Sequence, residues 1–531
     1  MSANLAAPGA LGCGPDCACQ DLSPGAPGAL DEVLGSTRAW CPACRRPEQA
    51  LYTASPEGVF LERLCPATGA RKIKIAETRS WFEERSGPGL LMGNPPGDKP
   101  VARGCPLDCG LCRAHLAELR LPVFSVTNQC QLDCPICFTH NRPDLVYHKS
   151  MSELGEILDA VESRSRSLDL VNLTGGEPFL HPGIMGILEE CARRSFGNVS
   201  VNTNGLKIAA DRALAEKVKE AGAEVVLSLD TLDPSTSLVI HGADIVREKI
   251  SALETLESLD IPTVLLPVWI PGLNDREIPF LLREYFHRPF VKGVTVQTVA
   301  YTGLRGGRFE PRRRATIEEV EGALSDAGIG AGDFFRHGSY HPLCYSTAYY
   351  LTDRDAKIPL ASLADKADLT EATADGYLMR PADKLLAAVR DRIDQIWARG
   401  ASKDETRLLR KLVASMRPPP GAADQDAGAR EWLRLQRKAF LDLGLVKTVT
   451  VHAHMDEDNF DLARVSYCGD LVPEEDGSMR PACAYNLLYR ERDPRFWAGE
   501  EKEAGEAAVK AEEKEEPKEG KEPKEGKEGG V

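Results

Sequence analysis

The sequence predicts an α/β protein built around a partial (β/α)6 barrel of the TIM type. A small cysteine-rich module precedes the barrel, and a helical region and a disordered tail follow it. Six short apolar runs alternate with amphipathic stretches between residues 122 and 310, and such alternation is typical of parallel βαβ units. Of the 16 cysteines, six lie between Cys13 and Cys65 and six more between Cys105 and Cys137. The cysteine-rich part therefore precedes most of the barrel.

The part before the barrel divides into three segments by composition. Residues 1–38 form a leader rich in Gly, Pro and Ala that also holds cysteines, and we expect it to be flexible. Residues 39–82 form a small module that starts at the knuckle "CPAC" and continues with hairpin-like sequence. Residues 83–121 connect this module to the barrel and carry the cysteine group "CPLDCGLC".

The barrel segment, residues 122–310, contains six strand candidates. Amphipathic helices are expected between them, for example at 151–164 and 211–222, because their apolar residues recur at helical spacing. Each helix would cross over one face of a parallel sheet. The expected strands are 122–127, 168–174, 198–203, 223–230, 262–268 and 293–299.

The pattern becomes helical after residue 311, for instance at 381–400 and 429–444. A short strand is expected at 446–454, and cysteine-bearing loops complete a region that ends near residue 498. Residues 499–531 are rich in Glu, Lys, Gly and Pro, with "PKEGKE" occurring twice. Such a segment buries too little apolar area to offset its conformational entropy, so we expect a disordered tail.

Composition and charge exclude some classes of function. The formal net charge of −15 argues against a nucleic-acid partner, because phosphate contacts need a basic surface. The chain shows no apolar run long enough to span a membrane and no signal-like N-terminus, so a cytoplasmic protein is expected, with peripheral membrane contact left open. Cysteines of a cytosolic protein bind metals more often than they form disulfides.

The stretch "CQLDCPICF" places Cys130, Cys134 and Cys137 on one loop directly after the first barrel strand. Thiolates are the usual ligands of iron–sulfur clusters, and a [4Fe–4S] cluster has four irons to ligate. Three cysteines would leave one iron open, and open coordination positions are the reactive ones. Closed structural zinc sites, the alternative, require four ligands.

This signature, followed one βα unit later by "TGGEP" (Thr174 to Pro178), resembles that of the radical S-adenosylmethionine (SAM) superfamily over residues 122–310. The resemblance implies that Cys130, Cys134 and Cys137 bind the catalytic [4Fe–4S] cluster. It also implies that the glycine-rich turn and later strand ends contact SAM, while an aromatic residue shields the cluster. The implied cofactor-binding residues are Phe138, Thr174, Gly175, Gly176, Glu177, Pro178, Asn202, Asn204, Ser228, Asp230 and Gln297.

The resemblance implies a reaction as well. SAM would bind the open iron, and reductive cleavage would release a 5′-deoxyadenosyl radical that abstracts hydrogen from an unactivated carbon. The protein would orient the reactants and exclude water and oxygen. A reductant such as ferredoxin or flavodoxin is an implied partner.

A second triplet of the same spacing, Cys105, Cys109 and Cys112, precedes the loop without a GGEP unit of its own. It could be a second SAM site or, as we expect, bind an auxiliary cluster. The order of motifs is similar to that of the group containing archaeal tetraether lipid synthase and the radical SAM methylase of methanopterin biosynthesis. In that group late cysteines bind an auxiliary cluster, which implies one or two auxiliary [4Fe–4S] clusters. The late cysteines here are Cys344, Cys468 and Cys483.

The sequence departs from that group in the N-terminal module, which should be rubredoxin-like or zinc-ribbon-like with two cysteine knuckles. The second knuckle reads "CPATG", so only Cys41, Cys44 and Cys65 are clear ligands for a single iron or zinc ion. A fourth ligand would come from the leader, in "CGPDCAC", or the metal would be absent. The stretch "RHGSYHPLC" also lacks a cysteine expected there, which leaves the ligands of the late cluster open.

Two further features receive plainer interpretations. His452 and His454 would face the same side of a strand, which we expect to be an exposed edge. The basic stretch "EPRRRA" (Glu310 to Ala315) is expected to be a solvated loop.

The sequence thus predicts a radical SAM enzyme that forms C–C bonds or methylates carbon on a lipid or a pterin-like small molecule. Two alternatives remain open at this point: a peptide-modifying radical SAM maturase and a non-catalytic iron–sulfur or zinc scaffold. Neither the substrate nor the oligomeric state follows from the sequence.

Overall fold

The computed structural model describes residues 31–86, 100–139, 146–165, 168–194, 196–353, 356–380, 383–400, 402–415 and 446–490. Most of the expected leader, the helix expected at 429–444 and the tail lie outside the described residues. In the described part, no helix combines the length and the apolar character that crossing a membrane requires.

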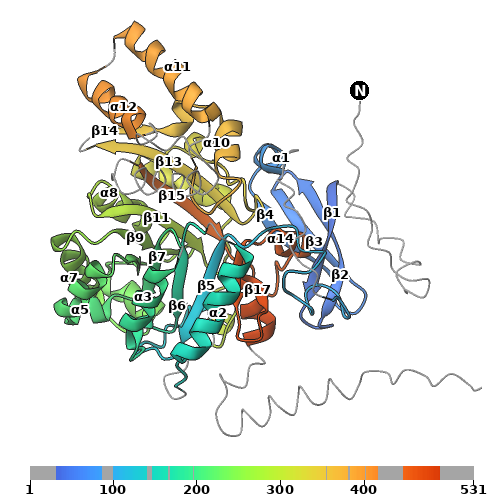
Figure 1. Cartoon of the computed structure of the whole chain (residues 1–531). Helices are drawn as coiled ribbons and strands as arrows, with labels where there is room; N and C mark the ends of the chain where they lie inside the picture. Colours follow the sequence, from blue (N-terminus) through green and yellow to red (C-terminus); the bar gives the residue numbers. More distant parts are fainter. Residues whose placement is uncertain are drawn as a thin grey trace, which may run out of the picture.

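The N-terminal module is a four-stranded antiparallel sheet in the order β1-β2-β3-β4. Its strands are β1 (Glu32–Cys41), β2 (Arg46–Ser55), β3 (Gly58–Cys65) and β4 (Gly69–Ala76), and helix α1 (Arg79–Ser86) follows. Because β1 pairs with β2 from Glu32 onward, the module begins before residue 39, and the end of the expected flexible leader is in fact a strand. The sheet lies beside the barrel (Figure 1).

Parallel strands form the barrel, as the alternation of strands and helices predicted. They are β5 (Leu121–Thr127), β6 (Val171–Gly175), β7 (Val199–Thr203), β8 (Glu224–Ser228), β9 (Thr263–Leu266) and β11 (Val291–Thr298), and a short β10 (Val268–Trp269) pairs with β11. Connecting helices include α2 (Met151–Arg164), α3 (Ile184–Arg193), α4 (Leu206–Ala210), α5 (Arg212–Glu220), α6 (Pro234–His241), α7 (Val246–Ser258) and α8 (Glu277–Tyr285).

Local sequence explains where α2 begins. The Ser150 side chain accepts a hydrogen bond from the Glu153 backbone N–H, and the Glu153 carboxylate accepts one from the Ser150 N–H. This reciprocal capping satisfies two of the unpaired donors at the start of the helix. The helix buries Leu154, Ile157 and Leu158 in the main core, which also contains Val171 and Leu173 of β6.

The region after residue 311 contains helices, but it also extends the barrel sheet. Strand β15 (Val446–Ala453) runs parallel to β11, and β13 (Tyr345–Asp353) pairs antiparallel with β15. At the other edge, β16 (Asp470–Pro473) pairs with β5, and β17 (Met479–Pro481) pairs with β16. The expectation of a helical region was therefore incomplete, because these pairings join segments far apart in the sequence.

The short strands β12 (Phe335–Arg336) and β14 (Ala356–Pro359) each pair antiparallel with β13 and so belong to the extended sheet. The helices after residue 311 are α9 (Ile317–Ala323), α10 (Lys366–Ala372), α11 (Asp383–Arg399), α12 (Lys403–Ser415), α14 (Leu462–Ser466) and α15 (Ala482–Ala484).

Candidate active site

The cysteine loop follows β5 at the carboxyl end of the barrel strands, the end at which barrel active sites form. Cys130, Cys134 and Cys137 are each partly exposed. Burial raises the pKa of Cys130 to about 12 and that of Cys134 well above its usual value, and Cys137 is close enough to raise both further. Among the described residues, the group of metal-ligating atoms that lie within 4.8 Å of one another is formed by Cys41, Cys44 and Cys65 of the N-terminal module, not by this loop.

Two glycines of "TGGEP" allow the turn after β6 to pack against the start of this loop. The backbone N–H of Gly176 donates to Thr127 O at 2.7 Å, and that of Glu177 donates to Gln129 O at 2.7 Å. A Cβ at Gly176 would lie 2.2 Å from Gln129 O, and one at Gly175 would lie 2.1 Å from Thr127 O. Gly175 also has a φ of +137°, which side chains rarely adopt. Only glycine fits at these two positions.

A second pair of glycines holds the other end of the loop. The Gly306 N–H donates to Cys137 O at 2.8 Å. A Cβ at Gly303 would lie 2.5 Å from the carbonyl carbon of Phe138, and one at Gly306 would lie 2.8 Å from Cys137 O. Close backbone packing on both sides therefore fixes the positions of the cysteines.

Glu177, expected to contact SAM, has its carboxylate committed to the protein. The side chain is fully buried. Its Oε1 accepts from Thr203 Oγ1 at 2.8 Å, and its Oε2 accepts from the Asn204 N–H at 2.8 Å. Burial raises the pKa of Glu177, and these hydrogen bonds work in the opposite direction. The carboxylate ties the turn after β6 to the end of β7.

Lys249 of α7 is a buried cation below the loop, and the sequence interpretation missed it. Its Nζ donates to Asn204 O at 2.8 Å and to Ser228 O at 2.6 Å. Burial lowers the pKa of Lys249, whereas Asp230, Cys134 and other nearby anionic groups raise it. Two strand ends that were expected to face SAM are thus held together by one ammonium group.

His241, at the end of α6, was also missed. It is buried, with Nδ1 3.8 Å from Cys134 Sγ and Nε2 3.6 Å from Asp230 Oδ2. Burial lowers its pKa to about 4, so the ring is neutral at pH 7. The Asp230 carboxylate itself accepts from the Val268 N–H at 2.7 Å and from Ser228 Oγ at 3.1 Å. The residues expected at the end of β8 therefore lie behind the cysteine loop.

A cavity of about 810 Å³ fills the inside of the barrel, lined by residues of the parallel strands and of β13 and β16. Five of the expected cofactor residues line it: Phe138, Thr174, Gly175, Asn202 and Gln297. The others, Gly176, Glu177, Pro178, Asn204, Ser228 and Asp230, do not line it. The structure thus divides the expected set into a cavity-facing group and a group that supports the loop.

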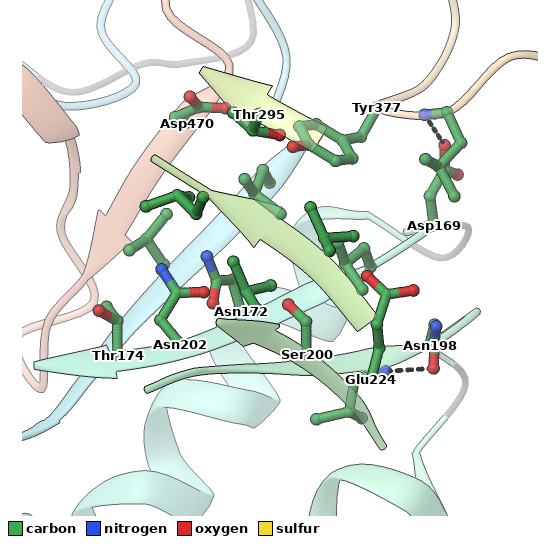
Figure 2. A pocket seen from close by; sticks show the side chains of 18 of the residues that line it. Asp169, Asn172, Thr174, Asn198, Ser200, Asn202, Glu224, Thr295, Tyr377 and Asp470 are labelled. Carbon is green, nitrogen blue, oxygen red and sulfur yellow. Dashed lines mark hydrogen bonds between the residues drawn. The ribbon is translucent and has the colours of Figure 1, made fainter. Parts of the chain in front are cut away.

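Much of the cavity wall is polar. Asn172, Ser200 and Glu224 are direct neighbours in the register of β6, β7 and β8, so they form one row across three strands. Figure 2 shows this row together with Asn202, which lies two residues after Ser200 in β7. The Oδ1 atoms of Asn172 and Asn202 are buried and have no hydrogen-bond partner among the described residues. Unpaired acceptors inside a cavity are available to donors of a ligand.

His452 and His454 line this cavity, so the expectation of an exposed edge was wrong. Strand β15 (Val446–Ala453) is paired on both sides, so it is not an edge strand. The His454 ring stacks on Phe138 at 5.2 Å between centroids, and its Nε2 lies 3.3 Å from Gln297 Nε2. Its Nδ1 lies 3.6 Å from Cys483 Sγ. His454 therefore links the cysteine loop to a late cysteine.

The connector cysteines and the late cysteines form two groups near one another. Cys109 lies close to Cys105, Cys112 and Cys468: the hydrogen bond with Cys105, burial and the charges of these thiols raise the pKa of Cys109 well above its usual value. Cys468 in turn interacts with Cys483 and Cys344. Arg464 Nε donates to Cys344 Sγ at 3.2 Å. The connector triplet and the late cysteines thus lie on the same side of the molecule.

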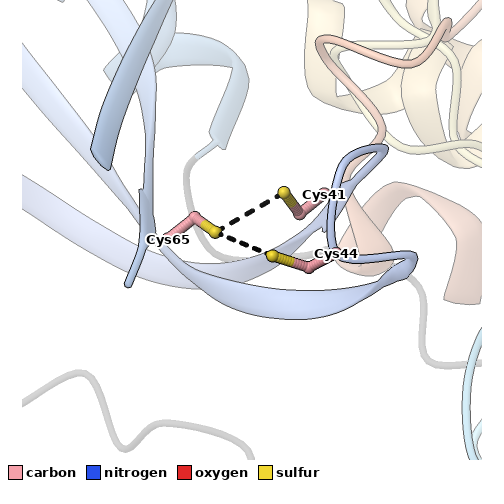
Figure 3. Close-up of side chains that lie close together, drawn as sticks. All are labelled: Cys41, Cys44 and Cys65. Atoms are coloured by element: carbon pink, nitrogen blue, oxygen red, sulfur yellow. Dashed lines mark hydrogen bonds between the residues drawn. The ribbon is translucent and has the colours of Figure 1, made fainter. Parts of the chain in front are cut away.

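Three thiols also meet in the N-terminal module. Cys65 Sγ lies 3.6 Å from Cys41 Sγ and 3.2 Å from Cys44 Sγ (Figure 3). A disulfide would require about 2.05 Å. These are free thiols at a spacing that one metal ion can bridge.

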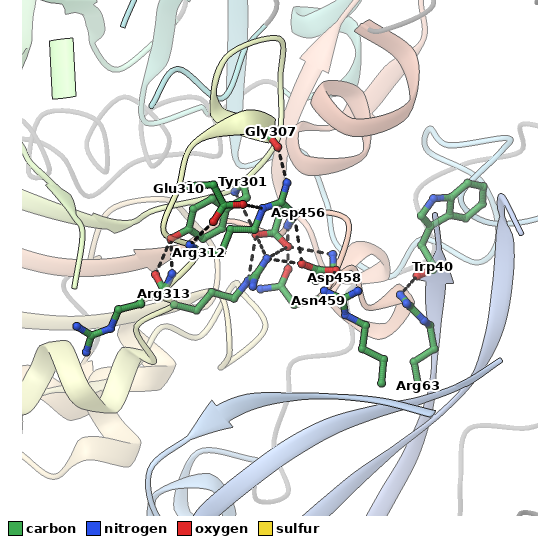
Figure 4. Close-up of polar contacts among 12 residues, drawn as sticks. Trp40, Arg63, Tyr301, Gly307, Glu310, Arg312, Arg313, Asp456, Asp458 and Asn459 are labelled. Atoms are coloured by element: carbon green, nitrogen blue, oxygen red, sulfur yellow. Dashed lines mark hydrogen bonds and ion pairs between the residues drawn. The ribbon is translucent and has the colours of Figure 1, made fainter. Parts of the chain in front are cut away.

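Residues 310–313 of the basic stretch form an exposed loop, as expected, but Arg314 is half-buried and paired. Arg314 donates to both carboxylate oxygens of Asp456 and, at 2.7 Å, to Asp458. Asp456 also accepts from the Tyr301 N–H at 3.1 Å. Figure 4 shows Tyr301, Asp456 and Asp458 beside the N-terminal module. Arg314 therefore joins the loop at 310–315 to the segment that contains Asp456 and Asp458.

Comparison with known proteins shows what this chain is similar to. Residues 124–284 match the model of the Radical SAM superfamily. The 7,8-dihydro-6-hydroxymethylpterin dimethyltransferase of Methanocaldococcus jannaschii is 25% identical over 485 residues, which cover 86% of this chain and 94% of the relative. The probable GTP 3',8-cyclase of Pyrococcus abyssi is 36% identical over 161 residues, or 30% of this chain and 50% of the relative.

The chain thus spans nearly all of the first relative and about half of the cyclase. Among solved structures, SuiB of Streptococcus suis matches with a TM-score of 0.34 and 15% identity, covering 52% of this chain and 66% of that one. The chain contains a radical SAM domain, and its expected resemblance to the methanopterin-biosynthesis enzyme is confirmed.

Proposed function

We propose that this chain, as a protein with a radical SAM domain, forms a C–C bond on a polar heterocycle of the pterin class, most simply by C-methylation. When bound, the [4Fe–4S] cluster and SAM would supply a carbon radical that abstracts hydrogen from the substrate. The residues of this chain would hold the two cofactors, orient the substrate inside the barrel and keep water out. The observation that carries the proposal is the cavity that begins beside the cysteine loop and has a row of polar side chains along its wall.

The residues present fit the cluster and SAM. Cys130, Cys134 and Cys137 offer three thiolates from one loop, which leaves room for one open iron. Thr174, Gly175 and Asn202 line the cavity next to that loop and would face SAM. Lys249 and His241 would act indirectly, by fixing the strand ends and the loop on its other side.

The cavity favours a compact polar substrate over a lipid. Its volume of about 810 Å³ falls within the roughly 300–1,000 Å³ typical of small-molecule sites. The row of Asn172, Ser200 and Glu224 offers acceptors to the N–H groups of an aminopyrimidinone edge. Two residues further along the strands, about 7 Å away, the opposite end of a bicyclic ring would reach Thr174 and the cysteine loop. The relative that covers most of the chain is named for a pterin substrate.

The other cysteines would serve electron transfer. Cys105, Cys109 and Cys112 would bind one auxiliary cluster, and Cys344, Cys468 and Cys483 would contribute to a second one. The contact between His454 and Cys483, 3.6 Å apart, supports a path between this region and the cavity. A ferredoxin or flavodoxin would supply the electrons, and the protein would work in the cytoplasm.

The test uses the full chain, reconstituted anaerobically with iron, sulfide and SAM. We expect dithionite to drive formation of 5′-deoxyadenosine, and 6-hydroxymethyl-7,8-dihydropterin to bind and to increase that rate. Cys134→Ala should abolish cleavage. Glu224→Gln should weaken pterin binding at least about tenfold, or 1.4 kcal/mol, whereas the exposed control Glu220→Gln should bind as wild type does.

Each outcome bears on a different part of the proposal. Unchanged cleavage in Cys134→Ala would refute the catalytic assignment. Cleavage that responds to an archaeal lipid precursor but not to the pterin would refute the substrate class alone.

A further inference from the structure

We propose that Cys41, Cys44 and Cys65 hold a single Zn²⁺ ion whose fourth ligand is an oxygen at the corner lined by Thr68. This site lies in the N-terminal module, outside the catalytic machinery. It departs from the four-cysteine site that the rubredoxin-like resemblance implies, and it would keep one exchangeable coordination position.

The sulfur spacing matches one tetrahedral ion. A Zn–S bond of about 2.3 Å gives a tetrahedral ligand-to-ligand edge of about 3.8 Å. The Cys41 and Cys65 sulfurs are 3.6 Å apart, the Cys44 and Cys65 sulfurs are 3.2 Å apart, and all three lie within 4.8 Å of one another. Two strands that flank β2 and one turn supply them: Cys41 ends β1, Cys65 ends β3, and Cys44 lies in the turn that follows β1.

Thr68 stands where the second cysteine of the knuckle "CPATG" would stand. Its Oγ1 lies 3.8 Å from Cys41 Sγ. The hydroxyl therefore lies beside the Cys41 sulfur, at a distance that suits a neighbouring ligand position on one ion.

The donor set favours zinc. Three thiolates and one neutral oxygen form a mixed set, and Zn²⁺ accepts such sets because its filled d shell imposes no geometry of its own. Within the described residues, no fourth Cys, His or carboxylate atom joins this group within 4.8 Å. Cys41, Cys44, Cys65 and Thr68 therefore permit an oxygen ligand at the fourth coordination position of the zinc ion.

The test uses the full chain purified anaerobically with its clusters, to which Zn²⁺ is added before excess is removed. We expect one tightly held zinc per chain, and zinc-edge X-ray absorption should report three sulfurs and one oxygen. Thr68→Cys should convert this signal to four sulfurs and should slow the loss of zinc to a chelator at least about tenfold. Cys65→Ser should lose the zinc while the iron content of the clusters stays the same.

Two controls keep the outcome unambiguous. Cys191→Ser, at a buried cysteine in α3 far from the module in sequence, should retain zinc with the same three-sulfur signal. Serine at Cys13, Cys17 and Cys19 together should also leave the signal unchanged. Four sulfurs in the wild type, a loss of sulfur on replacing the three leader cysteines, or no zinc retained by the wild type would each overturn the proposal.

Discussion

Lys249 offers the sharpest test of how the protein supports its cysteine loop. The proposed change is Lys249→Met, which keeps much of the side-chain volume and removes the charge. Two partly buried carbonyl groups, Asn204 O and Ser228 O, would lose their ammonium donor at 2.8 and 2.6 Å. Each orphaned group costs about 1–3 kcal/mol, and part of that cost is offset because an ammonium group no longer has to be buried. We expect a net loss of about 2–4 kcal/mol in the free energy of unfolding.

The informative comparison is with Lys447→Met. Lys447 is buried to a similar degree and donates to Phe286 O at 2.6 Å and Arg288 O at 2.7 Å. Chemical denaturation should therefore give similar losses of stability for both variants. Only Lys249→Met should also weaken SAM binding, by at least about tenfold, because its partners lie at the strand ends that support the loop. Equal SAM affinity in the two variants, at matched stability, would refute this reasoning.

Two other predictions concern the turn after β6 and the pH range of stability. Gly176→Ala should prevent full cluster assembly, measured as iron per chain, because the alanine Cβ would lie 2.2 Å from a backbone oxygen. The control Gly186→Ala in α3 adds its Cβ to open space, so this variant should assemble the cluster normally. Burial lowers the pKa of His337 to about 4, so the unfolded chain, with a histidine pKa near 6.5, takes up the proton first as the pH falls. Neutral His337 therefore stabilises the fold by about 3 kcal/mol at most. This stabilisation should be complete above pH 6.5 and should be lost as the pH falls towards 4. The thermal unfolding temperature of His337→Asn should accordingly depend less on pH than that of wild type. A wild-type pH dependence in His337→Asn would contradict this assignment.

The sequence was informative where the physical signal is local. Apolar runs of strand length and the capping box at Ser150 depend only on residues that are close together in the sequence, so the barrel strands and α2 could be predicted. Strand β15 was recognised as a strand, but its place inside the barrel depends on pairing with β11 and β13. Misplacing it led to the wrong environment for His452 and His454.

The residues that support the site could be recognised from the sequence only by a different signal, a charged residue at a position where an apolar one is expected. Lys249 interrupts an apolar stripe formed by Val246, Leu253 and Leu256, all buried on the same face of α7. A lysine at such a position signals a buried charge with dedicated partners. Glu177 shows where a motif misleads. The motif indicated contact with the cofactor, whereas the Glu177 carboxylate accepts hydrogen bonds from the protein itself. A motif specifies residue types, and only the fold specifies which atoms they contact.

The segment from His454 to Asp461 connects the cavity to the N-terminal module, and Asp461 is the residue to perturb. Asp461 accepts from Thr37 Oγ1 at 2.6 Å and from the Tyr52 hydroxyl, while the Trp40 N–H donates to Phe460 O at 2.9 Å. Asp461→Ala would leave two hydroxyls of the module without their acceptor, a cost of about 1–3 kcal/mol for each. We expect faster amide hydrogen exchange in β1 and in 455–461, with unchanged exchange in β7 and β8. If exchange stayed at wild-type rates in β1, the module would be held by other contacts, and its metal site could not influence the cavity through this segment.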